Sequence, residues 1–152
     1  MKLSDGIFNG AIAGAAGTTA LNAVTYLDMA VRGRPSSSGP EDTVERLAEK
    51  SSVRIPGDQE TRSHRVTGLG ALTGIASGLT IGAAVGTLRA AGWLPGLVAT
   101  SVIATLGAMA FTDGVMSALG VTDPRTWSAT DWASDVAPHL AYGLLTAVAL
   151  ER

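Results

Sequence analysis

Apolar residues along the chain gather into four long stretches without charge, separated by polar connections. These stretches are Gly6–Leu27, Val66–Leu88, Ala90–Thr112 and Val136–Leu150. A helix needs about 20 apolar residues to cross the hydrocarbon core of a bilayer, and the first three stretches meet that length. The fourth meets it only by starting near Trp132 and carrying Asp135 at the membrane surface. The pattern predicts transmembrane helices at about 6–31, 66–91, 94–119 and 133–150.

Together these helices predict an all-α fold, an integral membrane four-helix bundle formed by a single domain of residues 1–152. The alternative is a soluble helical bundle rich in Gly and Ala, whose outer helices would need polar faces that these stretches hardly show. Only 16% of the residues are charged, against a usual value of about 25%, which also favours the membrane. A cleaved signal peptide is a second alternative for the amino end, but Asn9 interrupts its apolar run.

The second stretch contains a regular row of glycines. It places Gly at every fourth position, at Gly70, Gly74, Gly78, Gly82 and Gly86. In water each Gly would weaken a helix by about 1 kcal/mol relative to Ala, but in a bilayer small residues let helix backbones approach closely. The first stretch repeats the spacing at Gly6, Gly10 and Gly14. We expect these glycines to pack the second span against the first and third spans; contact with a second copy of the chain is the alternative.

A charged connection at 32–65 separates the first two spans. Ser, Pro and Gly in its first part indicate a turn. The segment "PEDTVERLAEKSS" at 40–52 predicts a short amphipathic helix, because acidic residues follow Pro40 and a narrow apolar stripe runs along it. We expect this helix on the membrane surface or over the bundle. The last connection has room for one helical turn, and its Trp127 and Trp132 suit the membrane surface.

The distribution of basic residues predicts the orientation in the membrane. Four spans place both termini on one side and the two larger connections on the other. The side of the connections carries Arg32, Arg34, Arg46, Lys50, Arg54, Arg62, Arg65 and Arg125, whereas the terminal side carries Lys2, Arg89 and Arg152. Cytoplasmic loops are enriched in Lys and Arg, and an excess of Arg over Lys is typical of high-GC bacterial genomes. We therefore expect a bacterial cell (inner) membrane protein with connection 32–65 in the cytoplasm and both termini outside.

The two predicted hairpins share a pattern of residues. The first span ends in "LNAVTYLD" (21–28) and the third in "LGAMAFTD" (106–113), with Leu, Ala, an aromatic residue and Asp at the same offsets. The spans that follow begin "HRVTGL" (64–69) and "HLAYGL" (139–144). Such short matches also arise by chance, but their shared order indicates two tandem helical hairpin repeats with a pseudo-twofold axis along the membrane normal.

These repeats place several polar residues toward the same, cytoplasmic leaflet. The candidates for a polar network are Asp28, His64, Asp113, His139, Asn22 and Tyr142. Ionisable groups inside a span are costly and are functional candidates by default. In the structural interpretation, each Asp instead pairs with the His of the next helix and fixes the hairpin. Asp113 and His139 are the deeper pair, and His64 lies nearest to water.

Three short motifs resemble the YagU-like family of uncharacterised small bacterial inner-membrane proteins. They are "GAIAGAAGTTALNAV" in the first span, the His-led and Gly-rich second span, and "HLAYGLL" in the last span. The resemblance covers most of the helical residues. It implies a four-helix membrane protein tied to acid or envelope stress, and it carries over no catalytic residue. The long charged connection has no explanation in this resemblance.

Three functions follow from these observations. The first is a structural or accessory subunit of a larger membrane complex or homo-oligomer, which is favoured because a small bundle filled with Gly leaves little volume for a substrate path. The second is transport or proton handling by the Asp and His residues, since imidazole titrates near neutral pH. The third is a haem or metal site with His64 and His139 as ligands. Both His lie near the membrane surface, so we expect no metal and no cofactor.

The sequence contains no motif of a soluble enzyme. It has no nucleophile elbow, P-loop or dinucleotide fingerprint, and the glycines of "GLGALTG" follow helical spacing, so we expect no enzyme. The chain has no Cys, which excludes disulfides and thiolate metal sites. A net charge of −2 does not favour nucleic acid. The expected partners are the lipid bilayer and a protein partner or second copy that contacts glycine-rich helix faces.

Overall fold

Five α-helices and one 3₁₀ turn make up the computed structural model, which describes residues 2–151. The α-helices are α1 (Leu3–Arg32), α2 (Gly39–Lys50), α3 (Gln59–Ala90), α4 (Leu97–Ala118) and α5 (Ala129–Leu150). The 3₁₀ turn η1 (Pro124–Thr126) lies between α4 and α5, in the connection that had room for one helical turn. Helices hold 81% of the residues and the described part of the chain contains no strand, so the predicted all-α class is confirmed.

Capping residues decide where two of the long helices begin. Asp58 accepts a hydrogen bond from the backbone N–H of Thr61 (2.8 Å), so α3 begins at Gln59, well before the apolar run that starts at Val66. The hydroxyl of Ser128 accepts a hydrogen bond from the backbone N–H of Asp131 (3.2 Å), and the Asp131 carboxylate accepts one from Ser128. Hydropathy does not reveal these polar first turns, which lengthen both helices.

The short helix α2 packs against the polar end of α3. Its residue Val44 is buried, and Glu45 forms an ion pair with Arg62 of α3 (2.6 Å). Gly70 allows the close approach, because a Cβ atom there would lie 3.2 Å from Pro40. The amphipathic helix expected in this connection is present, and it covers the bundle at α3.

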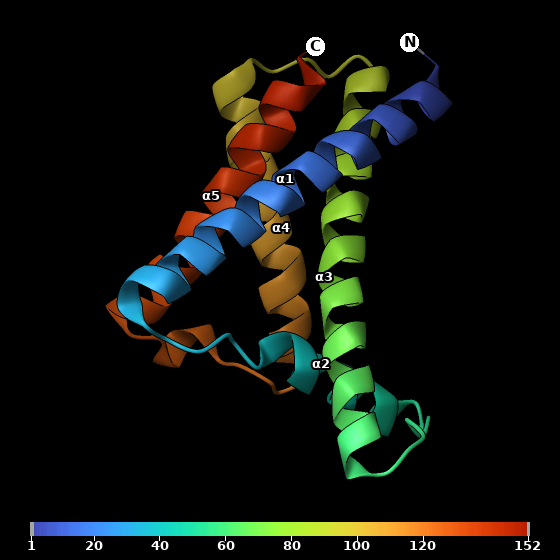
Figure 1. Cartoon of the computed structure of the whole chain (residues 1–152). Helices are drawn as coiled ribbons and strands as arrows, with labels where there is room; N and C mark the ends of the chain where they lie inside the picture. Colours follow the sequence, from blue (N-terminus) through green and yellow to red (C-terminus); the bar gives the residue numbers. More distant parts are fainter. Residues whose placement is uncertain (1, 152) are drawn as a thin grey trace.

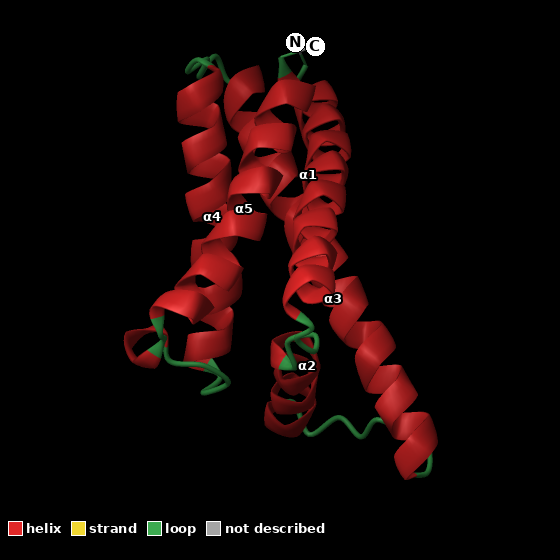
Figure 2. Cartoon of the chain, turned by 60° about the vertical axis from the view of Figure 1, so that its left-hand side comes forward, coloured by secondary structure: helices red, strands yellow, loops and turns green. Residues whose placement is uncertain are grey.

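The four long helices form a layered bundle in which α1 is central (Figure 1). α1 packs closely against α3 on one side and against α5 on the other, and α5 packs against α4. α3 and α4 have the weakest contact of these neighbouring pairs. Figure 2 shows α4 and α5 diverging from α3 toward the end of the bundle that carries α2, while both termini lie at the opposite end.

The contact between α1 and α3 is formed by glycines of both helices. Gly6, Gly10 and Gly14 lie against Gly86, Gly82 and Gly78 in antiparallel order; we call these six residues the glycine seam. A Cβ atom on Gly82 would collide with the carbonyl oxygen of Gly10 and would lie 2.6 Å from the Cα atom of Gly14. The two backbones are therefore in direct contact, and no larger residue fits without moving a helix.

The predicted packing of the other two glycines of α3 is corrected by the structure. Gly70 faces α2, and Gly74 faces open space rather than the first or third span. The third span, α4, supplies none of the atoms nearest to the five glycines of α3. A four-residue spacing turns gradually around a helix of 3.6 residues per turn, so the row of glycines leaves α1 before it reaches Gly70.

Two helices, α3 and α4, are long and apolar enough to cross a membrane. They correspond to the second and third of the four expected spans. α1 and α5, with 30 and 22 residues, are long enough for a span but do not combine this length with sufficient apolar character, so two of the four expected spans are supported among the described residues. The buried core among these helices is made of small residues and one aromatic ring, namely Val85, Ala104, Ala108 and Tyr142.

Candidate functional site

An acid–histidine cluster, formed by Asp113, Asp135 and His139, lies between α4 and α5. Asp135 and His139 are four residues apart and share one face of α5. The imidazole Nδ1 of His139 lies 2.8 Å from the Asp135 carbonyl oxygen and 3.3 Å from the Asp135 carboxylate. Because both of these oxygens only accept hydrogen bonds, Nδ1 carries the proton and donates it. His139 is thus held in one orientation by Asp135.

Asp113 approaches this pair from α4. It is half-buried and lies close enough to Asp135 and His139 for their charges to act on it. One carboxylate oxygen of Asp113 and one of Asp135 are buried without a hydrogen-bond partner in residues 2–151. Nearby, the Thr105 hydroxyl donates to the His139 carbonyl (3.3 Å) and joins α4 to α5. The structure therefore brings the predicted pair of Asp113 and His139 into one cluster and adds Asp135 to it.

The chemistry of this cluster is that of proton binding. A buried carboxylate without a donor is disfavoured in its charged form, and a proton on the carboxyl group supplies the missing donor. No group of His, Asp or Glu residues in residues 2–151 has the arrangement of a metal site. Within residues 2–151, the two buried oxygens accept no hydrogen bond from a hydroxyl, amide or guanidinium group. Such a donor would stabilise the ionised form of each carboxylate.

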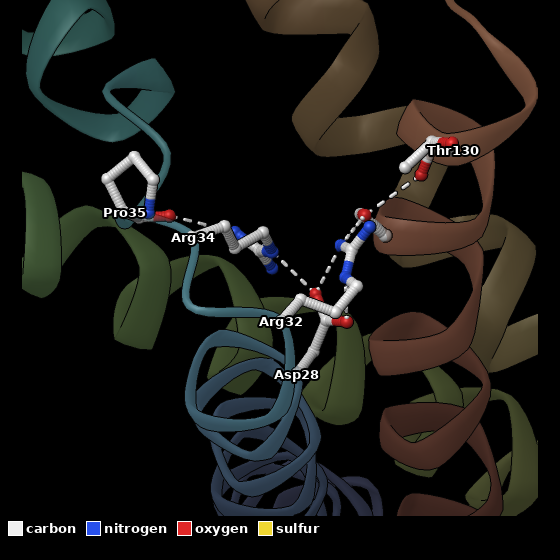
Figure 3. Close-up of polar contacts among 6 residues, drawn as sticks. Asp28, Arg32, Arg34, Pro35 and Thr130 are labelled. Atoms are coloured by element: carbon white, nitrogen blue, oxygen red, sulfur yellow. Dashed lines mark hydrogen bonds and ion pairs between the residues drawn. The ribbon is translucent and has the colours of Figure 1, made fainter.

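A second polar group, the arginine clamp, joins the end of α1 to α5 and consists of Asp28, Arg32, Arg34 and Ser134. Figure 3 shows the Asp28 carboxylate between the guanidinium groups of Arg32 and Arg34. Arg32 also donates to the hydroxyl of Ser134 on α5, and this hydroxyl donates to the Thr130 carbonyl (2.9 Å). The clamp holds α1 and α5 together at the end of the bundle that carries the longer connections.

The predicted pairing of Asp28 with His64 is wrong. Asp28 is occupied by two arginines that follow it closely in the chain, whereas His64 is exposed and lies 3.9 Å from Glu60 of its own helix. α3 begins earlier than its apolar run, which places His64 on the exposed start of the helix. His139, in contrast, is buried and contacts Asp135 of its own helix and Thr105 of α4.

The remaining candidates are Tyr142 and Asn22, whose side chains form no hydrogen bond with the acid–histidine cluster within residues 2–151. The Tyr142 hydroxyl donates to the Gly78 carbonyl (2.7 Å) and connects α5 to α3 in the centre of the bundle. Asn22 is half-buried, and its side chain makes no hydrogen bond within residues 2–151. The six candidates predicted as a single network are therefore distributed over separate contacts.

Three residues of these sites were missed as candidates by the sequence reasoning. Asp135 was placed only at the membrane surface, although its spacing of four residues from His139 indicates a shared helix face. Arg32 and Arg34 were treated only as charges that orient the protein. Arg32 reaches Asp28 at a spacing of four residues within α1, whereas the contact of Arg34 depends on the left-handed backbone of Gly33 (φ 62°), which turns the chain back after α1.

Hydrogen bonds shift the pKa of two carboxyl groups that lie outside the long helices. The backbone N–H of Thr61 lowers the pKa of Asp58. The Arg125 guanidinium lowers the pKa of Asp123. These carboxylates are charged at neutral pH and stabilise the helix start and the turn at which they lie.

No family model, no curated protein and no solved structure matches this chain, so the fold and the geometry of its polar groups carry the functional interpretation.

Proposed function

We propose that this chain is a multi-pass protein of the bacterial cell membrane, with α1, α3, α4 and α5 as its spans. Large apolar side chains are exposed on the outer faces of all four long helices, for example Phe8, Leu72, Val98 and Leu140. Extended apolar surface of this kind marks contact with a membrane or a partner. The resemblance to the YagU-like family is consistent with this location.

Within that membrane protein, we propose a proton-handling function for the acid–histidine cluster. The observation that carries this proposal is the pair of buried carboxylate oxygens, on Asp113 and Asp135, that have no partner in residues 2–151. A proton bound by either carboxyl group supplies a donor for its buried oxygen, and His139 balances part of the remaining charge. Imidazole and carboxyl groups in contact are common elements of proton relays inside membrane proteins.

Proton flux in proteoliposomes tests this function. The wild type and the variants Asp113→Asn, Asp135→Asn and His139→Gln are reconstituted with a pH-sensitive dye inside the vesicles. After a step in the external pH, we expect the internal pH of wild-type vesicles to change. The rate of this change should be at least about tenfold lower in each variant. Asp123→Asn, in the exposed turn before η1, is the matched control. Equal rates in all proteins, or rates equal to those of empty vesicles, would contradict the proposal.

A second candidate function is that of an accessory subunit in a larger membrane complex or a homo-oligomer. The observation in its favour is that Gly74 on α3 and Gly114 on α4 face open space, where a further helix could approach. Gentle extraction from native membranes tests it. A protein partner or second copy that is lost in Gly74→Leu supports this candidate, whereas a lone monomer at every concentration contradicts it.

A further inference from the structure

A crevice of about 410 Å³ opens at the end of the bundle that carries both termini, where α1, α3 and α5 meet. Apolar side chains of Ile12, Ala13 and Leu150 form its walls, and Gly6 and Gly86 lie at its base. Its volume is within the range of about 300–1,000 Å³ that is typical of small-molecule sites. The crevice is separate from the acid–histidine cluster, which shares none of its lining residues.

The glycine seam produces this hollow. Gly6 and Gly86 form the last pair of the seam, and a Cβ atom on Gly86 would lie 2.7 Å from the Cα atom of Gly10. Because these residues have no side chains, α1 and α3 stay in contact below the crevice while the space beside them remains unfilled. Leu150 packs against the core from the opposite wall.

Two polar side chains, those of Arg89 and Asn9, lie at the rim. Arg89 is half-buried in the last turn of α3, and neither the Arg89 nor the Asn9 side chain has a hydrogen-bond or ion-pair partner within residues 2–151. A guanidinium binds phosphate oxygens through two parallel hydrogen bonds, and an amide nitrogen adds a further donor. Long basic side chains at the end of a span extend toward the headgroup region of a bilayer.

We propose that this crevice binds one anionic phospholipid from the leaflet on the side of the termini. Arg89 and Asn9 hold the phosphate, and one acyl chain enters the apolar space between Ile12 and Leu150. Among the described residues that line the crevice, Arg89 supplies a cation and Asn9 an amide, and none supplies a carboxylate for the amine of a zwitterionic headgroup. This inference rests on the proposed membrane location and is independent of the proposed proton handling.

Native mass spectrometry of the full chain in detergent tests the site with phosphatidylglycerol as the added lipid. We expect one tightly held lipid per wild-type chain, and about tenfold weaker binding in Arg89→Gln because a charge-assisted pair is lost. Ile12→Trp, which fills the crevice without changing charge, should also displace the lipid. Matched controls are Arg54→Gln, in the connection at the opposite end, and Ile75→Trp, on an exposed face of α3. Circular dichroism of each variant verifies the helical fold.

Two further ligands, phosphatidylcholine and inorganic phosphate, test what the crevice recognises. Phosphatidylcholine should bind weakly, and inorganic phosphate alone should not compete, because the acyl chain supplies part of the affinity. Equal retention of phosphatidylglycerol in the wild type and in both crevice variants would overturn the lipid site, as would full competition by phosphate. Membrane fractionation separates the two proposals: a chain found in the membrane without bound lipid overturns only the crevice, and a chain found outside the membrane overturns both.

Discussion

Tyr142 shows how glycines create the interior of this bundle. Its side chain is 1% exposed, although it is the largest side chain in the core. The ring lies in a slot between α1 and α3, because a Cβ atom on Gly17 would lie 2.8 Å from it and a Cβ atom on Gly78 would lie 3.4 Å from it. The hydroxyl then reaches the Gly78 carbonyl. One aromatic residue thus joins α5 to both of the other helices.

The Tyr142 hydrogen bond should contribute measurably to stability. Tyr142→Phe keeps the ring and removes only the hydroxyl that donates to Gly78. We expect the free energy of unfolding to fall by about 1 kcal/mol, as measured by denaturant unfolding in detergent micelles. Tyr26→Phe, at an exposed position of α1, is the control and should leave stability unchanged. A loss of equal size in both variants would contradict the role of the buried bond.

Asp58 should make the start of α3 sensitive to acid. Its pKa lies below the ordinary value of 3.8 because the Thr61 amide donates to the charged carboxylate. The stabilisation is therefore complete above pH 3.8 and is lost as the pH falls through the lowered pKa. The protection factor of the Thr61 amide in hydrogen exchange, which corrects for the intrinsic pH dependence, should fall over that range in the wild type. Asp58→Asn keeps a capping group that does not titrate, so its Thr61 amide should not lose protection; the same acid response in both proteins would exclude Asp58 as its cause.

At the residue scale, Asp113 directly follows the third apolar stretch and His139 lies inside the fourth, and they were predicted as the deeper pair. The structure places them close enough for their charges to interact; the function of this pair stays a prediction. Asp28 failed as a predicted partner of His64 because nearby Arg32 and Arg34 compete for the same carboxylate. The turn that returns Arg34 to Asp28 depends on the conformation of a single residue, which a pattern of polar and apolar positions does not specify.

At the scale of elements, the charged residues that separate the apolar stretches allowed the positions of the long helices to be predicted. The expected ranges 6–31 and 133–150 agree closely with α1 (Leu3–Arg32) and α5 (Ala129–Leu150). The start of α3 was not predicted, because a capped polar turn continues a helix beyond its apolar part. The packing of the glycine row of α3 was predicted only in part, because the row turns around the helix. Gly86, Gly82 and Gly78 contact α1, Gly74 has no neighbour within the described chain, and Gly70 contacts α2.

The glycine seam should be intolerant of even one added methyl group. Gly82→Ala places a Cβ atom against the backbone of Gly10 and Gly14, so we expect a loss of about 1–3 kcal/mol in the free energy of unfolding. Gly74→Ala lies in the same row of α3 but faces open space, and it should cause no loss. Thermal unfolding in one detergent compares the two. Equal stability of both variants would show that the α1–α3 contact is looser than the structure indicates.

At the scale of the whole molecule, the helices place both termini at one end and the longer connections at the other (Figures 1 and 2). In a membrane this arrangement puts connection 32–65 and the turn before α5 on one side. The acid–histidine cluster and the arginine clamp belong to the half of the bundle nearer to those connections, and the crevice with Arg89 belongs to the other end. In the proposed membrane location, the two proposed sites would face opposite leaflets.

The proposed orientation is testable because the natural chain has no Cys. Single substitutions Ser51→Cys, Ser128→Cys and Ala91→Cys introduce one thiol each at an exposed position. With an impermeant thiol reagent added to intact cells, we expect labelling of Ala91→Cys only. All three should react after the cells are opened. Labelling of Ser51→Cys and Ser128→Cys in intact cells would reverse the orientation, and labelling of all three would contradict a multi-pass membrane protein.

The central place of α1 also determines the order in which the bundle is completed during synthesis. α1 is made first, yet one of its two principal partners, α5, is made last. The contact between α1 and α3 can form while the ribosome is still working, but the groove on the other face of α1 stays empty until residues 129–150 have emerged. A chain stopped before residues 129–150 therefore lacks one entire side of the interior around α1.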